Sequence, residues 1–290
     1  MTHLPLWIQA AIWGGFTGAA LLIGALMGYY IHLKQRMVAG IMAFGSGALI
    51  SAISFELIAE AYSKGGLLST SFGFILGAIV YSIANHRVSK YGAKHRKRSN
   101  LNKKISADEI YHNAVAIAIG ALIDGIPESI VIGLGIVEGG KVSVVTVAAI
   151  FISNLPEGLS SSAGMKNNSK SSAFVLRTWG GIALTGPLFA CIGYLFFQNV
   201  SLEIVAVIMA VAAGAILAMI VDTMIPEAFE ETHDFAGLLQ YWAFFAPLCS
   251  IKYKYRATDD ENEKSKALGI ESMVKCFNRY IMGKHGGGFF

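Results

Sequence analysis

The chain has 290 residues, of which 54% are hydrophobic and only 14% are charged, and its net charge is +4. Soluble domains carry about 25% charged residues, so this composition nearly excludes an ordinary soluble enzyme. The three cysteines, Cys191, Cys249 and Cys276, have no metal-binding spacing and argue against a disulfide framework or a structural zinc finger.

Apolar stretches recur along the whole chain, and a helix needs about 20 such residues to cross a bilayer. Hydrocarbon offers the backbone no hydrogen-bond partners, so each stretch is expected to be an α-helix. We therefore predict an all-α polytopic membrane protein. Its eight transmembrane helices are expected at residues 7–31, 38–62, 67–86, 112–136, 142–165, 174–197, 202–228 and, more weakly, 235–251.

The loop expected between the third and fourth spans, residues 87–111, is strongly basic. Basic loops stay on the cytoplasmic side, and the loops after the first and fifth spans then also lie inside. This arrangement places 13 basic residues inside and 2 outside, with the N-terminus outside. The basic run favours a topology signal or contact with anionic lipid over nucleic-acid binding. We expect a multi-pass protein of the plasma (inner) membrane.

The polar, basic tail at residues 252–290 does not follow this pattern, because eight spans would place it outside. Either the tail is exported or the last segment does not fully span. We favour eight spans, since terminal polar segments obey the charge rule less strictly. The tail is expected to be poorly ordered.

A short motif of an apolar residue, proline or alanine, and then glutamate occurs four times, as IAEAY, IPESI, LPEGL and IPEAF. Residues 47–62 align with residues 214–229 at an offset of 167, and residues 125–129 align with residues 154–158 at an offset of 29. Each pair lies on spans of opposite direction. We therefore predict three helices, a central pair and three inverted helices, an arrangement typical of secondary transporters.

Carboxylates lie within these spans, although each costs about 2.5–3.5 kcal/mol to insert. Asp124 and Glu128 are four residues apart and share a helix face, as do Asn154 and Glu157, which are three apart. No lysine or arginine lies deep in spans 4, 5 or 7, so these acids must protonate or bind a cation. A divalent cation held by oxygen atoms meets this need.

The other ionisable residues of the spans have competing interpretations. Glu60 and Glu227 lie near span ends, which favours a role as interfacial carboxylates over a role as metal ligands. The role of Glu56 is ambiguous. For His112 an interfacial position, and for His233 a solvated helix end, is favoured over a role as a metal ligand. Asp222, in the inner third of span 7, is read as a site residue.

At these residues the chain resembles the ZIP family of divalent-metal transporters, over roughly residues 6–250. The resemblance rests on the order of the spans, the basic loop, the proline–glutamate motifs on spans 4 and 5, and the sequence of span 7. It implies an eight-helix fold with a central binuclear metal site built by spans 2, 4, 5 and 7.

Carried over by position, the resemblance implies a mixed set of ligands. Glu128 and Glu157 match ligand glutamates of the family, whereas Asp124 and Ser153 stand where the family has histidines. Asn154 occupies the next polar position, and Asp222 fits the first of two acids, with Thr223 in place of the second. The implied metal residues are Asp124, Glu128, Ser153, Asn154, Glu157 and Asp222.

The missing imidazoles favour a shift toward harder cations, because carboxylate and amide oxygens suit Mn²⁺, Mg²⁺ or Ca²⁺. Zinc and iron remain open. We expect a secondary transporter that moves divalent metal cations toward the cytoplasm, with the metal as substrate and no cofactor. The chain lacks GxGD and HExxH motifs, which disfavours an enzyme. The partners expected are divalent metal cations and the lipid bilayer, with a homodimer left open. The alternative is a transport-inactive membrane scaffold or metal sensor of the same fold.

Overall fold

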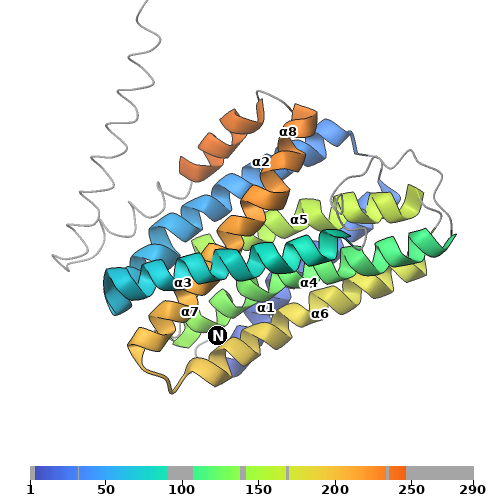
Figure 1. Ribbon diagram of the computed structural model, residues 1–290. Coiled ribbons are helices and arrows are strands. Elements are labelled where there is room, and N and C mark those ends of the chain that lie inside the picture. The colour runs from blue at the N-terminus through green and yellow to red at the C-terminus, as the bar shows by residue number, and fades with distance from the viewer. Residues whose placement is uncertain are drawn as a thin grey trace, which may run out of the picture.

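The computed structural model describes residues 4–31, 33–90, 107–137, 142–167, 170–232 and 235–245, and every regular element in these ranges is a helix (Figure 1). Two of the elements, η1 and η3, are single π-helical stretches within longer helices. The elements are α1 (Leu6–Tyr30), α2 (Gln35–Ala52), η1 (Ile53–Leu57), α3 (Ile58–Val88), α4 (Ala107–Val137), α5 (Val144–Asn167), α6 (Ser172–Phe197), α7 (Leu202–Met219), η3 (Ile220–Met224), α8 (Ile225–Thr232) and a short helix, Phe235–Phe245.

Six continuous helical segments of the described chain are long and apolar enough to cross a membrane. The all-helical class is therefore confirmed for the described residues, and the six segments are compatible with a multi-pass membrane protein. One of the six segments, Gln35–Val88, has 54 residues, more than twice the length that a crossing needs. Within it Gly66 has φ 68° and ψ −174°, a conformation that essentially only glycine adopts, and two helices meet there. This break lies between the expected spans 38–62 and 67–86.

The helix ends differ from the expected ones mainly at the basic loop. Residues 87–88 belong to α3 and residues 107–111 belong to α4, so the prediction of a loop over all of 87–111 was wrong at both ends. Hydropathy detects only the apolar part of a helix, and polar turns that extend beyond it escape the pattern. Residues 91–106, residues 246–251 of the last expected span and the tail 252–290 lie outside the described residues.

The helices pack into two groups that also contact each other extensively, since α2 packs against α5 more extensively than against α8. In the first group α1 packs against α4, α5 and α6, and α4 packs against α6. In the second group α3 packs against α7, and α2 packs against α8. The groups meet where α2 contacts α5 and where α4 contacts α7 and α3 (Figure 1). The helices with the proline–glutamate motifs, α4 and α5, thus lie along this boundary.

Glycines let the backbones approach closely at the crossings, as is usual for membrane helices. At the α1–α6 crossing Gly14 and Gly186 face each other's carbonyl oxygens, and a Cβ added to Gly14 would lie 2.6 Å from Gly186 O. Gly47 on α2 faces the backbone of Gln240 in the helix Phe235–Phe245, whereas Gly214 on α7 faces the backbone of Phe74 on α3. These contacts leave no room for a side chain at the crossings.

The two π-helices occupy equivalent positions of the repeated sequence. η1 begins at Ile53 and η3 begins at Ile220, a separation of 167 residues, which is the offset of the sequence match. Pro226 follows η3, but Ala59 stands at the matching position after η1, so proline is not their common cause. A π-helical stretch within an α-helix is uncommon and often marks a functional position. The two π-helices are thus separated by the same number of residues as the two aligned segments of the sequence.

Candidate functional site

Three carboxylates lie inside the helix bundle on α4 and α5. The exposed fraction is 1% for Asp124, 2% for Glu128 and 5% for Glu157. Ser153 and Asn154 are buried beside them in sequence on α5. These five predicted residues are thus enclosed by protein. The three acids are interior groups and do not face lipid.

Each of the two helices carries a proline one residue before its buried glutamate. Pro127 in α4 and Pro156 in α5 lie in helix interiors, where proline removes a hydrogen bond to the carbonyl four residues earlier, at Ile123 and Ile152. Gly45 on α2 packs against the Ile152 carbonyl, since a Cβ added to this glycine would lie 3.3 Å from Ile152 O. Each proline thus frees one backbone carbonyl oxygen on a helix that carries a buried glutamate.

Asp124 is bound by a residue of α3. The Tyr81 hydroxyl donates a hydrogen bond of 2.5 Å to Asp124 Oδ1, and Tyr81 is itself only 3% exposed. A distance of this size is typical of a charge-assisted bond to a carboxylate. Tyr81 therefore fixes the position of the Asp124 carboxyl group in the interior.

Asp222 lies in a different environment from the other predicted ligands. It is exposed, it belongs to the π-helix η3, and its Oδ2 accepts a hydrogen bond of 3.3 Å from the Ser82 hydroxyl. Ser82 follows Tyr81 directly on α3. Consecutive residues of one helix thus bind one buried acid and one exposed acid.

The polar residues of α5 point to different neighbours. Asn154 Nδ2 donates to the Thr17 carbonyl on α1 at 3.2 Å, and the Ser153 hydroxyl donates to the Ile150 carbonyl of its own helix at 2.9 Å. The amide nitrogen of Asn154 is directed at α1, and the amide oxygen is the atom of this side chain that can bind a cation. Both residues retain oxygen atoms that can accept a cation.

No three His, Cys, Asp or Glu side chains come close enough to hold a metal ion within the described part of the chain. The structure thus brings Asp124, Glu128, Glu157 and Asp222 into no group of three. A cation bound here would need neutral oxygens, such as those of Ser153, Asn154 and the freed carbonyls, or a movement of α4 relative to α5. Hard cations accept such mixed oxygen ligands.

Glu56, whose role the sequence left ambiguous, joins η1 to the start of α5. Its carboxylate accepts a hydrogen bond of 2.7 Å from the Ser143 hydroxyl and a second bond from the Thr146 hydroxyl. Ser143 Oγ also accepts from the backbone N–H of Thr146 at 3.3 Å, as a helix cap does. A negative charge is favourable at a helix N-terminus. Glu56 therefore has a structural role.

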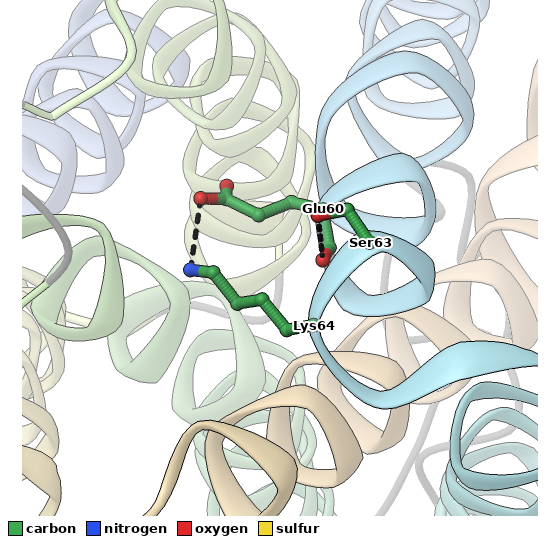
Figure 2. Close-up of polar contacts among 3 residues, drawn as sticks. All are labelled: Glu60, Ser63 and Lys64. Carbon is green, nitrogen blue, oxygen red and sulfur yellow. Dashed lines mark hydrogen bonds and ion pairs between the residues drawn. The ribbon is translucent and has the colours of Figure 1, made fainter.

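Glu60 forms an ion pair with Lys64, one turn later on the same helix, at 3.0 Å (Figure 2). The Ser63 hydroxyl donates to the Glu60 carbonyl at 2.8 Å in the same turn. The pair lies just before the break at Gly66, so the structure places Glu60 at a helix end. The side chains of His112 and His233 lie outside the described residues.

Tyr81 is the site residue that the sequence interpretation missed. The sequence did carry a signal, because the polar residues Tyr81 and Asn85 are four residues apart in an apolar span. In the structure both are buried, whereas the neighbouring Ile79, Val80 and Ile83 are exposed. A polar pair at this spacing marks the face of a membrane helix that turns to protein.

Comparison of the chain with family models and with curated proteins finds no match. The residues that the structure describes form helices, several of them suited to crossing a membrane, with carboxylates buried among them. Its resemblance to the ZIP family stays a prediction from the motifs.

Proposed function

We propose that this chain is a secondary transporter of divalent metal cations, similar to the ZIP family. The observation that supports it is the burial of three carboxylates, Asp124, Glu128 and Glu157, in an apolar helix bundle. Across the residues whose burial the structure describes, no lysine, arginine or histidine is buried. Buried negative charge is costly without a nearby cation, and a transported metal ion supplies one.

The donor set favours a hard cation as cargo. The proposed site consists of carboxylate, amide, hydroxyl and carbonyl oxygens, from Asp124, Glu128, Ser153, Asn154 and Glu157, without imidazole. Such oxygens suit Mn²⁺ and similar ions better than Zn²⁺, although carboxylates also bind zinc and iron. Exposed Asp222 is proposed to receive the ion on its way between the site and the cytoplasm.

The proposed architecture has eight spans in a 3+2+3 inverted repeat. The matching π-helices support it, because they lie at the offset of the aligned segments. The packing supports it as well: exchanging α1 with α6, the second span with the seventh, and α4 with α5 converts the α1–α5 contact into the α6–α4 contact. Under the same exchange the Gly47–Gln240 contact corresponds to the Gly214–Phe74 contact.

Transport is proposed to proceed by alternating access without ATP. The two helix groups meet at α4 and α5, so movement of one group against the other would open the site first to one side and then to the other. The N-terminus is proposed to lie outside a plasma membrane, and flux to run toward the cytoplasm, with protons displaced from the carboxylates.

The test is isotope uptake by purified protein in liposomes, with Mn²⁺, Zn²⁺ and Fe²⁺ and without ATP. The wild type is expected to give saturable uptake, with Mn²⁺ competing at least as well as Zn²⁺. Glu157→Gln is expected to abolish uptake, whereas Glu203→Gln, at an exposed acid in the first turn of α7, is expected to leave it unchanged. Retained uptake in Glu157→Gln would contradict the proposal.

The second candidate is a transport-inactive scaffold or metal sensor. No group of three acid, histidine or cysteine side chains is assembled among the described residues, which is compatible with a scaffold as well as with a transporter. The same experiment separates the two, because a scaffold or sensor would give no uptake above that of empty liposomes.

A further inference from the structure

We propose that the basic corner formed by Tyr29, Lys166, Lys170, Phe174 and Arg177, where α1, α5 and α6 meet, binds the headgroup of an anionic phospholipid. The phosphate would be held by Lys170 and Arg177. This inference requires that the helices cross a membrane, but it does not depend on metal transport. The contacts that carry it join the end of α1 to the ends of α5 and α6.

Two hydrogen bonds of Tyr29 hold the basic corner together. The Tyr29 hydroxyl donates to the Lys170 carbonyl at 3.2 Å, and the Lys166 ammonium group donates to the Tyr29 carbonyl at 2.7 Å. Lys166 also lies over the Tyr29 ring, 5.4 Å from its centroid. The last carbonyls of a helix lack partners within it, so Lys166 satisfies the end of α1, where positive charge is favourable. The backbone of Lys170 is thereby fixed beside α1.

Lys170 and Arg177 are the bases of the corner that remain open to an anion. The Lys170 ammonium group lies 5.0 Å from the centroid of the Phe174 ring, and Arg177 is exposed. Neither base forms an ion pair with a residue that the structure describes. Arg177 follows Phe174 by three residues, so the two lie on the same side of α6. The two cations therefore flank one aromatic ring.

The three helices of the corner supply no nearby negative charge. The sequences of α1 and α6 contain no acidic residue, and the one acid of α5 is the buried Glu157. Glu157 lies nine residues before Lys166, which is about 14 Å along the helix axis. Charge complementarity therefore favours an anion that comes from outside these helices.

The surroundings favour an anion that belongs to the membrane. Arg177 lies in the second turn of α6, and an exposed charge on a membrane-spanning helix is costly unless its long side chain reaches the headgroup region. Tyr30, at the end of α1, is 61% exposed, and tyrosine is enriched at the interface between hydrocarbon and headgroups. A guanidinium group binds phosphate through two parallel hydrogen bonds. The corner thus fits a phospholipid headgroup better than a soluble phosphate.

The experiment measures, by native mass spectrometry, the phosphatidylglycerol and phosphatidylcholine that stay bound to protein from mixed vesicles. Wild type should retain phosphatidylglycerol in preference. Lys170→Gln/Arg177→Gln should weaken this binding about 30-fold, since each base near a membrane surface contributes about 5-fold. Arg87→Gln/Lys90→Gln is the matched control, because it removes the same charge from exposed positions at the end of α3, which packs against α7. The control should retain phosphatidylglycerol as wild type does.

Equal losses in the two double variants, or no lipid preference in wild type, would overturn the inference. Displacement of the bound lipid by excess glycerol phosphate would also overturn it, because that result would assign the corner to a soluble anion. These measurements contain no metal ion, so their outcome is separate from that of the uptake test.

A measurement on wild-type protein decides the question if Lys170→Gln/Arg177→Gln does not fold. Protein in vesicles is acetylated with a water-soluble reagent, and the modified lysines are identified by mass spectrometry. Phosphatidylglycerol should protect Lys170 relative to Lys90, whereas phosphatidylcholine should not. The same ratio of labelling in both lipids would overturn the inference.

Discussion

Tyr81 Oη and Asp124 Oδ1 lie 2.5 Å apart in the interior, between α3 and α4. The next residue, Ser82, contacts the exposed Asp222 on η3. Asp124 and Asp222 both belong to the predicted metal residues, but they differ in burial, and they are held by successive residues of one helix. The proposed site is thus a pathway with a buried part on α4 and α5 and an exposed part at η3.

The difference in burial predicts unequal effects of neutralising these acids. Glu128→Gln should reduce metal uptake about 100-fold or more, because Glu128 is buried and the ion would lose a ligand that water cannot replace. Asp222→Asn should raise KM less than about 10-fold, since Asp222 is exposed whereas Glu128 is enclosed in the bundle. Initial rates of Mn²⁺ uptake into proteoliposomes measure both. Equal losses of uptake in the two variants would show that burial does not determine how much each acid contributes to transport.

The α1–α6 crossing predicts a stability difference between neighbouring glycines. Gly14→Ala places a Cβ 2.6 Å from Gly186 O and 2.8 Å from Ala190 Cβ, whereas nothing lies within 4 Å of a Cβ on Gly15. We expect Gly14→Ala to reduce the free energy of unfolding by about 1–3 kcal/mol. Gly15→Ala should leave it unchanged or slightly raised. Thermal unfolding in detergent measures this, and equal midpoints would contradict the observed crossing.

The contact of Glu56 with the start of α5 predicts that two helix caps differ in how much they stabilise the protein. Ser143→Ala removes both the cap of Thr146 and the hydrogen bond to Glu56, whereas Ser171→Ala removes only the cap of Phe174 on α6. A cap contributes about 1 kcal/mol, and a hydrogen bond to a charged group about 1.5–3 kcal/mol. Ser143→Ala should therefore destabilise the protein more. The excess should vanish in a Glu56→Ala background, where a persisting excess would exclude Glu56 as its source.

The proposed topology predicts which side each loop faces. In a variant without native cysteines, Lys141→Cys before α5 should react with a membrane-impermeant maleimide added to intact cells. Lys170→Cys before α6 should react only after the cells are permeabilised. The basic inner loops underlie this orientation. The reverse labelling pattern would show that the chain lies in the membrane the other way round.

Sequence alone could predict the apolar helices and the burial of Asp124, Glu128 and Glu157, because both follow from local features. Apolar length marks the spans, and the expected boundary between spans 38–62 and 67–86 contains Gly66, where the 54-residue helical segment breaks. Asp124 and Glu128 were expected on one face from their spacing, and both are buried.

The partners of those acids could not be predicted in the same way. The Tyr81–Asp124 bond depends on how α3 and α4 rotate against each other, which no single helix determines. The exposure of Asp222 depends likewise on what covers η3. The π-helices also lack a residue signature, since Ala59 and Pro226 stand at equivalent positions after them.

The most direct test of the central claim is the anomalous scattering of Mn²⁺ in crystals of the wild-type protein. We predict a peak within coordination distance of carboxylate oxygens of Glu128 and Glu157, between α4 and α5. The peak should be lost in crystals of Glu157→Gln. A peak only at exposed acids such as Asp222, or none at a saturating Mn²⁺ concentration, would contradict the account.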